Sequence, residues 1–381
     1  MSSALALPNI ALAGAAARGR RYAALDAWRG LAALSVVYGH QTAGRVGASL
    51  FIAFYLAVDF FFVLSGFVLA HRYWDELVRE RKPFYPVLVA RVARLYPAHV
   101  FVLFALLIAF GIEAIPAYRG GTPLLAAWRE AIPPFPGGPG LPTFLLNLLL
   151  LQNVGLTPTG LTWNVPSWSI SVEFFGSLAV LGLIAFWRRP GVRIALVAVA
   201  CAGYGLVLAF KDGILDATYE TLWHAVNLGL VRAIAGIAAG VLCLLFVRRY
   251  LTSRMPATLL ATLLELLAIA CVVVLMLRPQ YHDPRDILFP LAALLLVAVF
   301  SLEAGAVSRT LRLAPLLYLG SLSYAIYLVH WPLLFVMVEQ YRLPPALYYL
   351  AVFAAAVLTH HAVEVPARRF IMQYAKRAHA A

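Results

Sequence analysis

The stretch LDAWRGLAALSVVYGH, residues 25–40, combines an apolar segment of membrane type with Asp26 and Arg29 at one end and His40 at the other. Titratable side chains inside hydrocarbon are costly unless they are paired or hydrated. Arg29 and His40 are eleven residues apart, close to three helical turns, so they share one face about 16 Å apart. Asp26 and Arg29 are i,i+3 neighbours that can neutralise each other. This spacing predicts a polar track into a helix bundle. A snorkelling Arg29 with an interfacial His40 is the alternative.

The composition of the whole chain is that of a membrane protein. Of its 381 residues, 63% are hydrophobic and 12% are charged, and the mean hydropathy is +0.84. Soluble domains carry about twice that charged fraction. The net charge of +13 is typical of loop arginines that fix membrane topology, so we expect a lipid bilayer and no nucleic acid as partner. Cys201, Cys243 and Cys271 lie in apolar runs without metal-ligand spacing, which predicts buried free thiols.

Apolar runs of about 20 residues predict an all-α, polytopic bundle of about ten transmembrane helices. The expected spans are residues 26–42, 51–71, 95–115, 167–187, 194–210, 228–247, 257–277, 287–301, 316–338 and 346–363. An eleventh run, FLLNLLLLQNVGL, is short and bounded by Pro142 and Pro158.

The basic residues orient this bundle. If the eleventh run does not cross, 21 of the 30 Lys and Arg residues lie in loops on one side and seven lie on the other. If it crosses, the asymmetry largely disappears. The positive-inside bias therefore predicts both termini in the cytosol and a non-crossing outer segment near residues 143–155. We expect residues 1–21 to be a flexible cytosolic tail, 22–372 the transmembrane domain and 373–381 a second cytosolic tail.

Two further spans carry buried carboxylates. Asp59, in YLAVDFFFVLSGF, would be costly facing lipid, and a salt bridge to an arginine of another helix is favoured over direct chemistry. In WSISVEFFG, Ser169 and Glu173 share a face at i,i+4, and Glu173 lies about 9 Å below the outer surface, a depth similar to that of His40. A carboxylate beside a histidine is a familiar general-base arrangement, and a structural Ser–Glu hydrogen bond is the competing interpretation.

Arginines mark the inner edge of the membrane. Arg91 and Arg94, in RVARLYP, lie at i,i+3 on a helix that enters the third span. Two guanidinium groups on one face suit phosphates, although an isolated pair is also typical of ordinary topology signals. The pair gains significance because Arg29 emerges at the same depth.

Later spans contain further polar residues. Tyr324, Tyr327 and His330 recur at successive turns, which indicates a polar stripe lining a cavity, and a satisfied core histidine is an equal alternative for His330.

Arg232 and Glu265 also lie within spans and could form an ion pair. His360, His361 and Glu364 lack a metal-binding pattern, because adjacent histidines point to different faces, so we expect no metal.

Six stretches taken together resemble a known family. They are LDAWRGLAALSVVYGH, AVDFFFVLSGFVLA, RVARLYP, WSISVEFFG, LGSLSYAIYLVHWPLL and VEVPARRF, at residues 25–40, 57–70, 91–97, 168–176, 319–334 and 363–370. In this order they resemble successive landmarks of the acyltransferase-3 family, integral membrane O-acyltransferases of the type that modify bacterial surface polysaccharides. The resemblance extends from about residue 22 to 372.

The resemblance implies ten crossings of the inner (plasma) membrane and a cytosolic acyl-CoA donor, with acetyl as the default acyl group. The acceptor would be a hydroxyl of an extracytoplasmic or lipid-linked carbohydrate. The Arg-x10-His signature of the family maps onto Arg29 and His40, and its RxxR pair onto Arg91 and Arg94. Its WSxxxE element maps onto a further set of three residues, namely Trp168, Ser169 and Glu173.

The residues fit this chemistry. Arg91, Arg94 and Arg29 would hold the phosphates of coenzyme A, and the polar track would carry its arm toward His40. His40 would accept the proton of the acceptor hydroxyl, with Glu173 orienting His40 or the acceptor, and an acyl-histidine intermediate is the variant.

A proton-coupled transporter is the alternative function. Buried Asp59, Glu173, His40 and His330 are also typical of transporters. Transporters, however, often show inverted repeats, which this sequence lacks.

Overall fold

The computed structural model describes most of the chain. Its described residues are 21–43, 53–131, 140–156, 161–187, 191–216, 221–222, 226–252, 256–277 and 282–380. All but the last residue of the expected N-terminal tail therefore lies outside the described residues. The expected C-terminal tail is helical through Ala380.

The described residues are almost entirely helical, as expected. The α-helices are α2 (Ala23–Thr42), α3 (Ala57–Trp74), α4 (Tyr85–Arg119), α5 (Leu124–Ala131), α6 (Leu141–Leu148), α7 (Ser167–Trp187), α8 (Val192–Lys211), α9 (Leu228–Phe246), α10 (Thr258–Met276), α11 (Phe289–Phe300), α12 (Ala306–Leu311), α13 (Ala314–Leu333), α14 (Pro345–Thr359) and α15 (Val365–Ala380). The 3-10 segments are η1 (Phe54–Leu56) and η4 (Pro284–Leu288), and the π segments are η2 (Asp75–Arg79), η3 (Val247–Leu251), η5 (Leu334–Gln340) and η6 (His360–Glu364). Strands β1 (Thr221–Leu222) and β2 (Val226–Asn227) form one short antiparallel pair.

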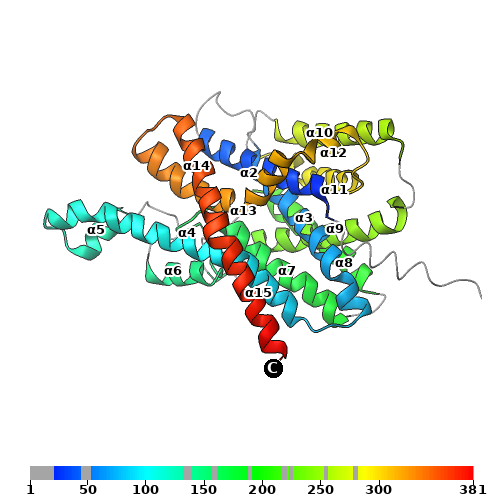
Figure 1. The fold of residues 1–381 in the computed structure, drawn as a ribbon, viewed down its shortest axis with the longest axis horizontal. Coiled ribbons are helices and arrows are strands. Elements are labelled where there is room, and N and C mark those ends of the chain that lie inside the picture. The colour runs from blue at the N-terminus through cyan, green and yellow to red at the C-terminus, as the bar shows by residue number, and fades with distance from the viewer. Residues whose placement is uncertain are drawn as a thin grey trace, which may run out of the picture.

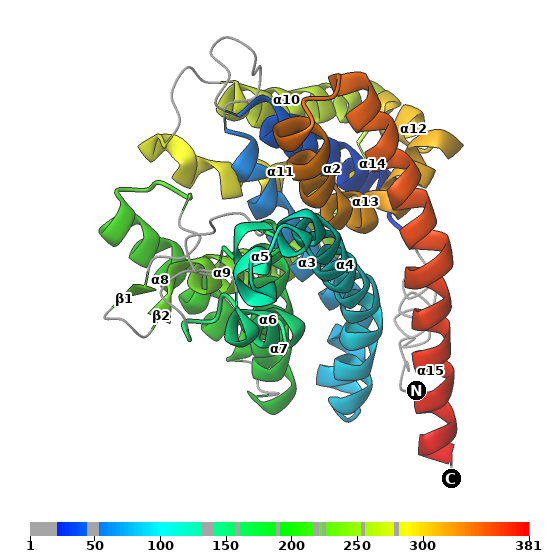
Figure 2. The ribbon, with the colours of Figure 1, turned by 90° about the vertical axis from the view of Figure 1, so that its left-hand side faces the viewer.

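Local sequence explains where several helices begin. A proline occupies the first turn of α4, α11, α13 and α14, where the missing N–H costs no helical hydrogen bond. Asn227 caps α9 by accepting a hydrogen bond from the Leu230 amide at 2.9 Å. The π segment η6 joins α14 to α15, so that the two form one long helix whose C-terminal end projects past the rest of the bundle (Figures 1 and 2).

Eight of the described helical segments are long and apolar enough to cross a membrane. They are Phe54–Arg79, Tyr85–Arg119, Ser167–Trp187, Val192–Lys211, Leu228–Leu251, Thr258–Met276, Ala314–Val338 and Pro345–Arg377. Helices α2 and α11 are not among them. Helix α11 has only 12 residues, and the charged and polar residues of α2 lower its hydropathy. Helix α6 has eight residues, about 12 Å, and is too short to cross, in line with the expected non-crossing segment.

Helices α2 and α13 pack against each other through glycine. A Cβ atom at Gly320 would collide with the backbone of Asp26, and one at Gly30 would lie 2.8 Å from the Gly320 nitrogen. Small residues at these positions let the two backbones approach closely, as they do between membrane helices. This close packing holds the face of α2 that carries Arg29 and His40 against α13.

A buried ion pair joins α3 to α9. Arg232 Nε donates to Asp59 Oδ1 at 2.8 Å, and neither residue is exposed to solvent. The predicted salt bridge of Asp59 to an arginine on another helix is therefore confirmed.

The ion pair that Arg232 and Glu265 could have formed is absent among the described residues. Glu265 instead accepts hydrogen bonds from the backbone amides of Gly305, Val307 and Ser308 at the start of α12. A carboxylate is well placed there because a helix begins with unpaired N–H groups.

His360, the first residue of η6, lies beside a carboxylate. His360 Nδ1 lies 2.9 Å from a Glu364 oxygen, and among the described residues no group of three or more His, Cys, Asp or Glu forms a possible metal site.

The three cysteines are free, but only Cys243 is buried, whereas Cys201 is exposed on α8. The predicted burial is wrong for Cys201 on α8 and for the half-buried Cys271 on α10, because both helices present much of their apolar surface outward.

Candidate active site

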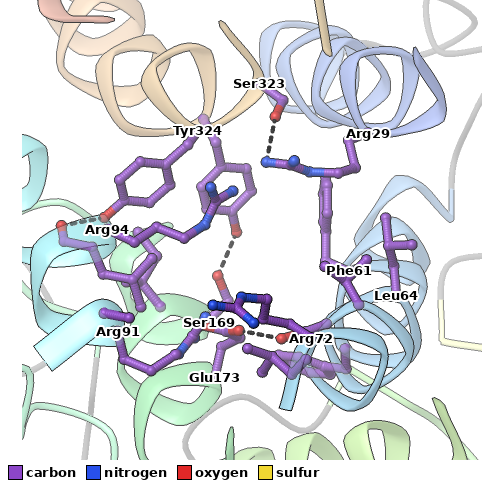
Figure 3. Close-up of a pocket in the computed structure, with 18 of the residues that line it drawn as sticks. Arg29, Phe61, Leu64, Arg72, Arg91, Arg94, Ser169, Glu173, Ser323 and Tyr324 are labelled. Carbon is purple, nitrogen blue, oxygen red and sulfur yellow. Dashed lines mark hydrogen bonds and ion pairs between the residues drawn. The ribbon is translucent and has the colours of Figure 1, made fainter. Parts of the chain in front are cut away.

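A cavity of about 460 Å³ lies among six helices, α2, α3, α4, α7, α13 and α15. Arginines dominate its polar lining, as Figure 3 shows for four of the five. The five are Arg29, Arg72, Arg91, Arg94 and Arg368. Glu173 is the one carboxylate among the described residues that line it.

The Glu173 carboxylate binds two cavity residues. Arg91 donates to one of its oxygens through Nη2, and Ser65 donates to the other through Oγ. Arg91 is a buried guanidinium, only 4% exposed, so Glu173 compensates part of its charge.

The prediction that Glu173 lies beside His40 is corrected by these contacts. Among the described residues, Glu173 forms no hydrogen bond with His40 or with the Ser169 hydroxyl. The physical reason is that, away from water, a guanidinium is a stronger hydrogen-bond partner for a carboxylate than a neutral imidazole or a hydroxyl.

Two of the other four arginines give the cavity positive charge without a carboxylate partner, whereas Arg72 is paired with Glu76 at 2.7 Å. Arg29 contacts Asp26 at 3.5 Å and donates to Ser323 Oγ at 3.2 Å. Arg94 and Arg368 form no ion pair with any described carboxylate, although the Glu364 charge acts on Arg29 and Arg368 together with the repulsion from Arg94. Arginines that line a cavity without carboxylate partners can bind an anion there. Guanidinium groups suit phosphates in particular.

Two tyrosines of α13 close the cavity on another side. Tyr324 OH donates to the Leu95 carbonyl at 2.6 Å, and Tyr327 OH lies 2.8 Å from Ser169 Oγ. Both tyrosines line the cavity, which confirms that part of the predicted polar stripe, but His330 is not part of the lining. The ring of Tyr327 lies 5.7 Å from the ring of His330, so Tyr327 links the cavity to the histidines.

His40 and His330 form a pair outside the cavity. His330 Nε2 lies 3.1 Å from His40 Nδ1, and the two ring planes lie within 26° of each other with their centroids 5.2 Å apart. The rings of Phe54 and Trp331 pack against the His40 ring in T-shaped arrangements, with centroid distances of 4.8 and 5.2 Å. Arg29 and His40 both contact α13, so the prediction that they share one face of their helix is confirmed.

Sequence reasoning missed Arg72, Arg368 and Ser65 as cavity residues. Arg72 and Arg368 lie in basic segments that are expected on the cytosolic side. In such segments the sequence cannot distinguish an arginine that binds a ligand from one that only fixes membrane topology. Ser65 lies six residues after Asp59 in the same apolar helix, and no local pattern distinguishes it from a packing residue.

Comparison with known proteins identifies the family to which this arrangement belongs. Residues 22–359 match the family described as "Acyltransferase domain". The chain belongs to the acyltransferase 3 family. It is therefore an acyltransferase and a multi-pass membrane protein that uses an acyl donor.

Three curated proteins are similar to this chain, and two of them are named as acyltransferases. "Acyltransferase MdmB" of Streptomyces mycarofaciens is 31% identical over 291 residues, 72% of this chain and 67% of that protein. "Exopolysaccharide production protein ExoZ" of Rhizobium meliloti (strain 1021) is 28% identical over 285 residues, 72% of this chain and 74% of that protein. "Putative peptidoglycan O-acetyltransferase YrhL" of Bacillus subtilis (strain 168) is 23% identical over 372 residues, 90% of this chain and 54% of that protein. No solved structure matches the chain.

Proposed function

We propose that this acyltransferase is an O-acyltransferase of the inner (plasma) membrane that moves an acyl group, acetyl by default, from cytosolic acyl-CoA to a hydroxyl of an extracytoplasmic or lipid-linked carbohydrate. The proposal includes ten crossings, with α2 and α11 spanning in addition to the eight candidate spans, and both termini in the cytosol. The names of two relatives, an exopolysaccharide production protein and a putative peptidoglycan O-acetyltransferase, support a carbohydrate acceptor and an acetyl group.

The observation that carries the proposal is the cavity with five arginines and one carboxylate, linked through Tyr327 to the His40–His330 pair. Coenzyme A carries phosphates at one end and a thioester at the end of a flexible arm. Arg91, Arg94 and Arg29 bind the phosphates in this scheme. Glu173 holds Arg91 in place rather than orienting His40.

The arm must then pass Tyr327 to bring the thioester to His40. The spacing of Arg29 and His40 along α2 corresponds to about 16 Å. Asp26 and Asp59 support the scheme indirectly, since Asp26 holds Arg29 and Asp59 fixes α3 against α9.

In the proposed reaction His40 acts as general base. Its imidazole accepts the proton of the acceptor hydroxyl as the oxygen attacks the thioester carbonyl. The new C–O bond forms, the C–S bond breaks, and the departing thiolate takes the proton from the imidazolium. The products are the ester and free coenzyme A.

A transfer assay in membranes tests the function. Membranes that contain the wild-type protein, incubated with radiolabelled acetyl-CoA, should release free coenzyme A and label an envelope glycan. His40→Ala should lower the rate by about 10²–10⁴-fold, the usual contribution of a general base. His361→Ala is the matched control, because His361 is an exposed histidine that contacts Tyr318 away from the site. Unchanged coenzyme A release by His40→Ala contradicts the proposal.

Two further measurements identify the donor and the acceptor. Arg91→Ala/Arg94→Ala should raise the donor KM by about tenfold or more, because hydrogen bonds to charged groups are worth about 1.5–3 kcal/mol each. A donor KM equal to that of the wild type contradicts the phosphate assignment. Mass spectrometry of envelope glycans from a deletion strain should show the loss of one acyl group, which names the acceptor.

A further inference from the structure

His330 makes a defined contact through each of its two ring nitrogens. Its Nδ1 lies 2.8 Å from the backbone carbonyl oxygen of Tyr327, one turn earlier in α13. Its Nε2 lies 3.1 Å from His40 Nδ1. The residue is fully buried, so water does not replace either partner.

These two contacts determine where the protons lie in a neutral pair. A carbonyl oxygen only accepts hydrogen bonds, so Nδ1 of His330 must carry the hydrogen. A neutral imidazole has one N–H, and Nε2 of His330 is therefore an acceptor. His40 Nδ1 must then be the donor, which leaves the lone pair of His40 on Nε2.

We propose that His330 is a positioning residue that fixes the tautomer of His40, so that Nε2 of His40 is the basic nitrogen. The inference rests on the proposed function, in which His40 is the base. The Tyr327 carbonyl fixes His330, and His330 fixes His40, whose ring also interacts with the backbone of Val36 one turn earlier in α2. The flanking rings of Phe54 and Trp331 hold the His40 ring in the orientation that this hydrogen bond requires.

The His40–His330 pair resembles the histidine and aspartate of a serine protease, but the group that orients the basic histidine is different. In a serine protease a carboxylate binds the Nδ1–H of the catalytic histidine and keeps its Nε2 available. Here the orienting acceptor is a neutral imidazole, which places no negative charge beside His40. When His40 accepts the hydroxyl proton at Nε2, its Nδ1–H stays bonded to His330, and the accepted proton leaves from Nε2 to the thiolate.

Nitrogen-15 NMR of the full-length protein in bilayers tests the tautomer directly. Histidine is labelled with ¹⁵N at both ring nitrogens, and the His40 signals are those absent from His40→Gln. We expect a protonated Nδ1 and an unprotonated Nε2 on His40 in the wild type. A protonated Nε2 with an unprotonated Nδ1 overturns the proposal.

Kinetics test whether the tautomer matters. His330→Leu, which removes the acceptor, should lower kcat about tenfold or more with an unchanged donor KM. His330→Gln should recover most of that loss, because its amide N–H can donate to the Tyr327 carbonyl while its oxygen accepts from His40. His99→Leu is the matched control, since His99 is also buried and also bonds to a backbone carbonyl, that of Asn147, at 2.7 Å. Its kcat per folded enzyme should be that of the wild type.

The outcomes separate this inference from the proposed function. A wild-type kcat for His330→Leu, or an equal loss in the Leu and Gln variants, overturns the positioning role while an inactive His40→Ala still supports the function. An active His40→Ala removes the proposed function itself.

Discussion

Two arginine–carboxylate pairs join helices in this protein, and they lie in different surroundings. The Asp59–Arg232 pair is sealed, with both side chains 0% exposed and the rings of Phe62 and Trp168 about 6.0 and 5.8 Å from the guanidinium. The Arg91–Glu173 pair borders a cavity, with side chains 5% and 16% exposed. The Asp59–Arg232 pair is balanced, whereas the cavity beside the Arg91–Glu173 pair also contains Arg94 and Arg368, which pair with no described carboxylate.

The comparison shows that an ion pair inside a membrane bundle has no fixed meaning. A buried pair by itself is weak support for either stability or function. What distinguishes the two pairs is the charge around them. The sealed pair closes a contact between α3 and α9, whereas the cavity pair leaves unpaired cations facing a hollow that can hold an anion.

The largest expected effect is the loss of stability when the buried Asp59–Arg232 pair is broken. Asp59→Asn leaves Arg232 as an uncompensated buried charge, which typically costs about 3–5 kcal/mol. Thermal unfolding of the detergent-purified protein should show a matching loss of stability. Asp59→Leu/Arg232→Met should recover much of it, because apolar residues of similar volume often replace a buried pair without loss. A change below about 1 kcal/mol for Asp59→Asn would show that the pair does not hold α3 to α9.

The second-largest expected effect is a loss of donor affinity when an arginine of the cavity is removed. Arg368→Ala should weaken donor binding about tenfold, because one charge-assisted hydrogen bond to a phosphate is lost. Thermal stability should not change, because Arg368 pairs with no described carboxylate. Arg369→Ala is the matched control, because Arg369 follows Arg368 directly in α15 but does not line the cavity. Equal donor KM values for the two variants would remove Arg368 from the donor site.

A smaller effect is expected where the cavity meets the histidines. Tyr327→Phe keeps the ring and removes the hydroxyl that contacts Ser169 at 2.8 Å. The expected cost is about 1 kcal/mol of stability, the usual net worth of one hydrogen bond. A double-mutant cycle with Ser169→Ala isolates the pairwise contribution. A coupling energy of zero would mean that this contact does not fix Tyr327.

The smallest effect is expected for a surface pair. Arg79 contacts Asp75 at 3.2 Å in an i,i+4 geometry, and its side chain is 65% exposed. Arg79→Gln should change the free energy of unfolding by no more than about 0.5 kcal/mol, because exposed pairs are screened by water. The same thermal-unfolding assay provides the check, and a loss comparable to that of Asp59→Asn would contradict the ranking by burial.

The sequence predicts the features that depend on spacing along one helix. Arg29 and His40 share a face because eleven residues make almost three turns, and the structure places both against α13. Hydropathy predicts an all-helical membrane bundle. It is less decisive for α2 and α11, where polar residues or short length weaken the signal.

Partner choice between distant helices is the part that sequence reasoning could not supply. The sequence places Glu173 near the outer surface and Arg91 at the inner edge, so their contact shows that these two predicted depths cannot both be right. The packing of α4 against α7 brings the two residues together, and that packing leaves no pattern in the sequence. Glu265 caps α12 rather than pairing with Arg232, since the nearest unpaired N–H groups depend on the chain path. Arg72 and Arg368 reach the cavity through helix packing that leaves no local pattern.

Donor binding by the arginines and transfer chemistry at the histidines are assigned here to separate places, and one binding measurement tests this most directly. The dissociation constant of a non-hydrolysable acyl-CoA analogue is measured at equilibrium for purified wild type, His40→Ala and Arg91→Ala/Arg94→Ala. His40→Ala should bind the analogue as the wild type does, and the double arginine variant should bind it at least about tenfold more weakly. Wild-type affinity in the double arginine variant, or an equal loss in His40→Ala, would contradict the account.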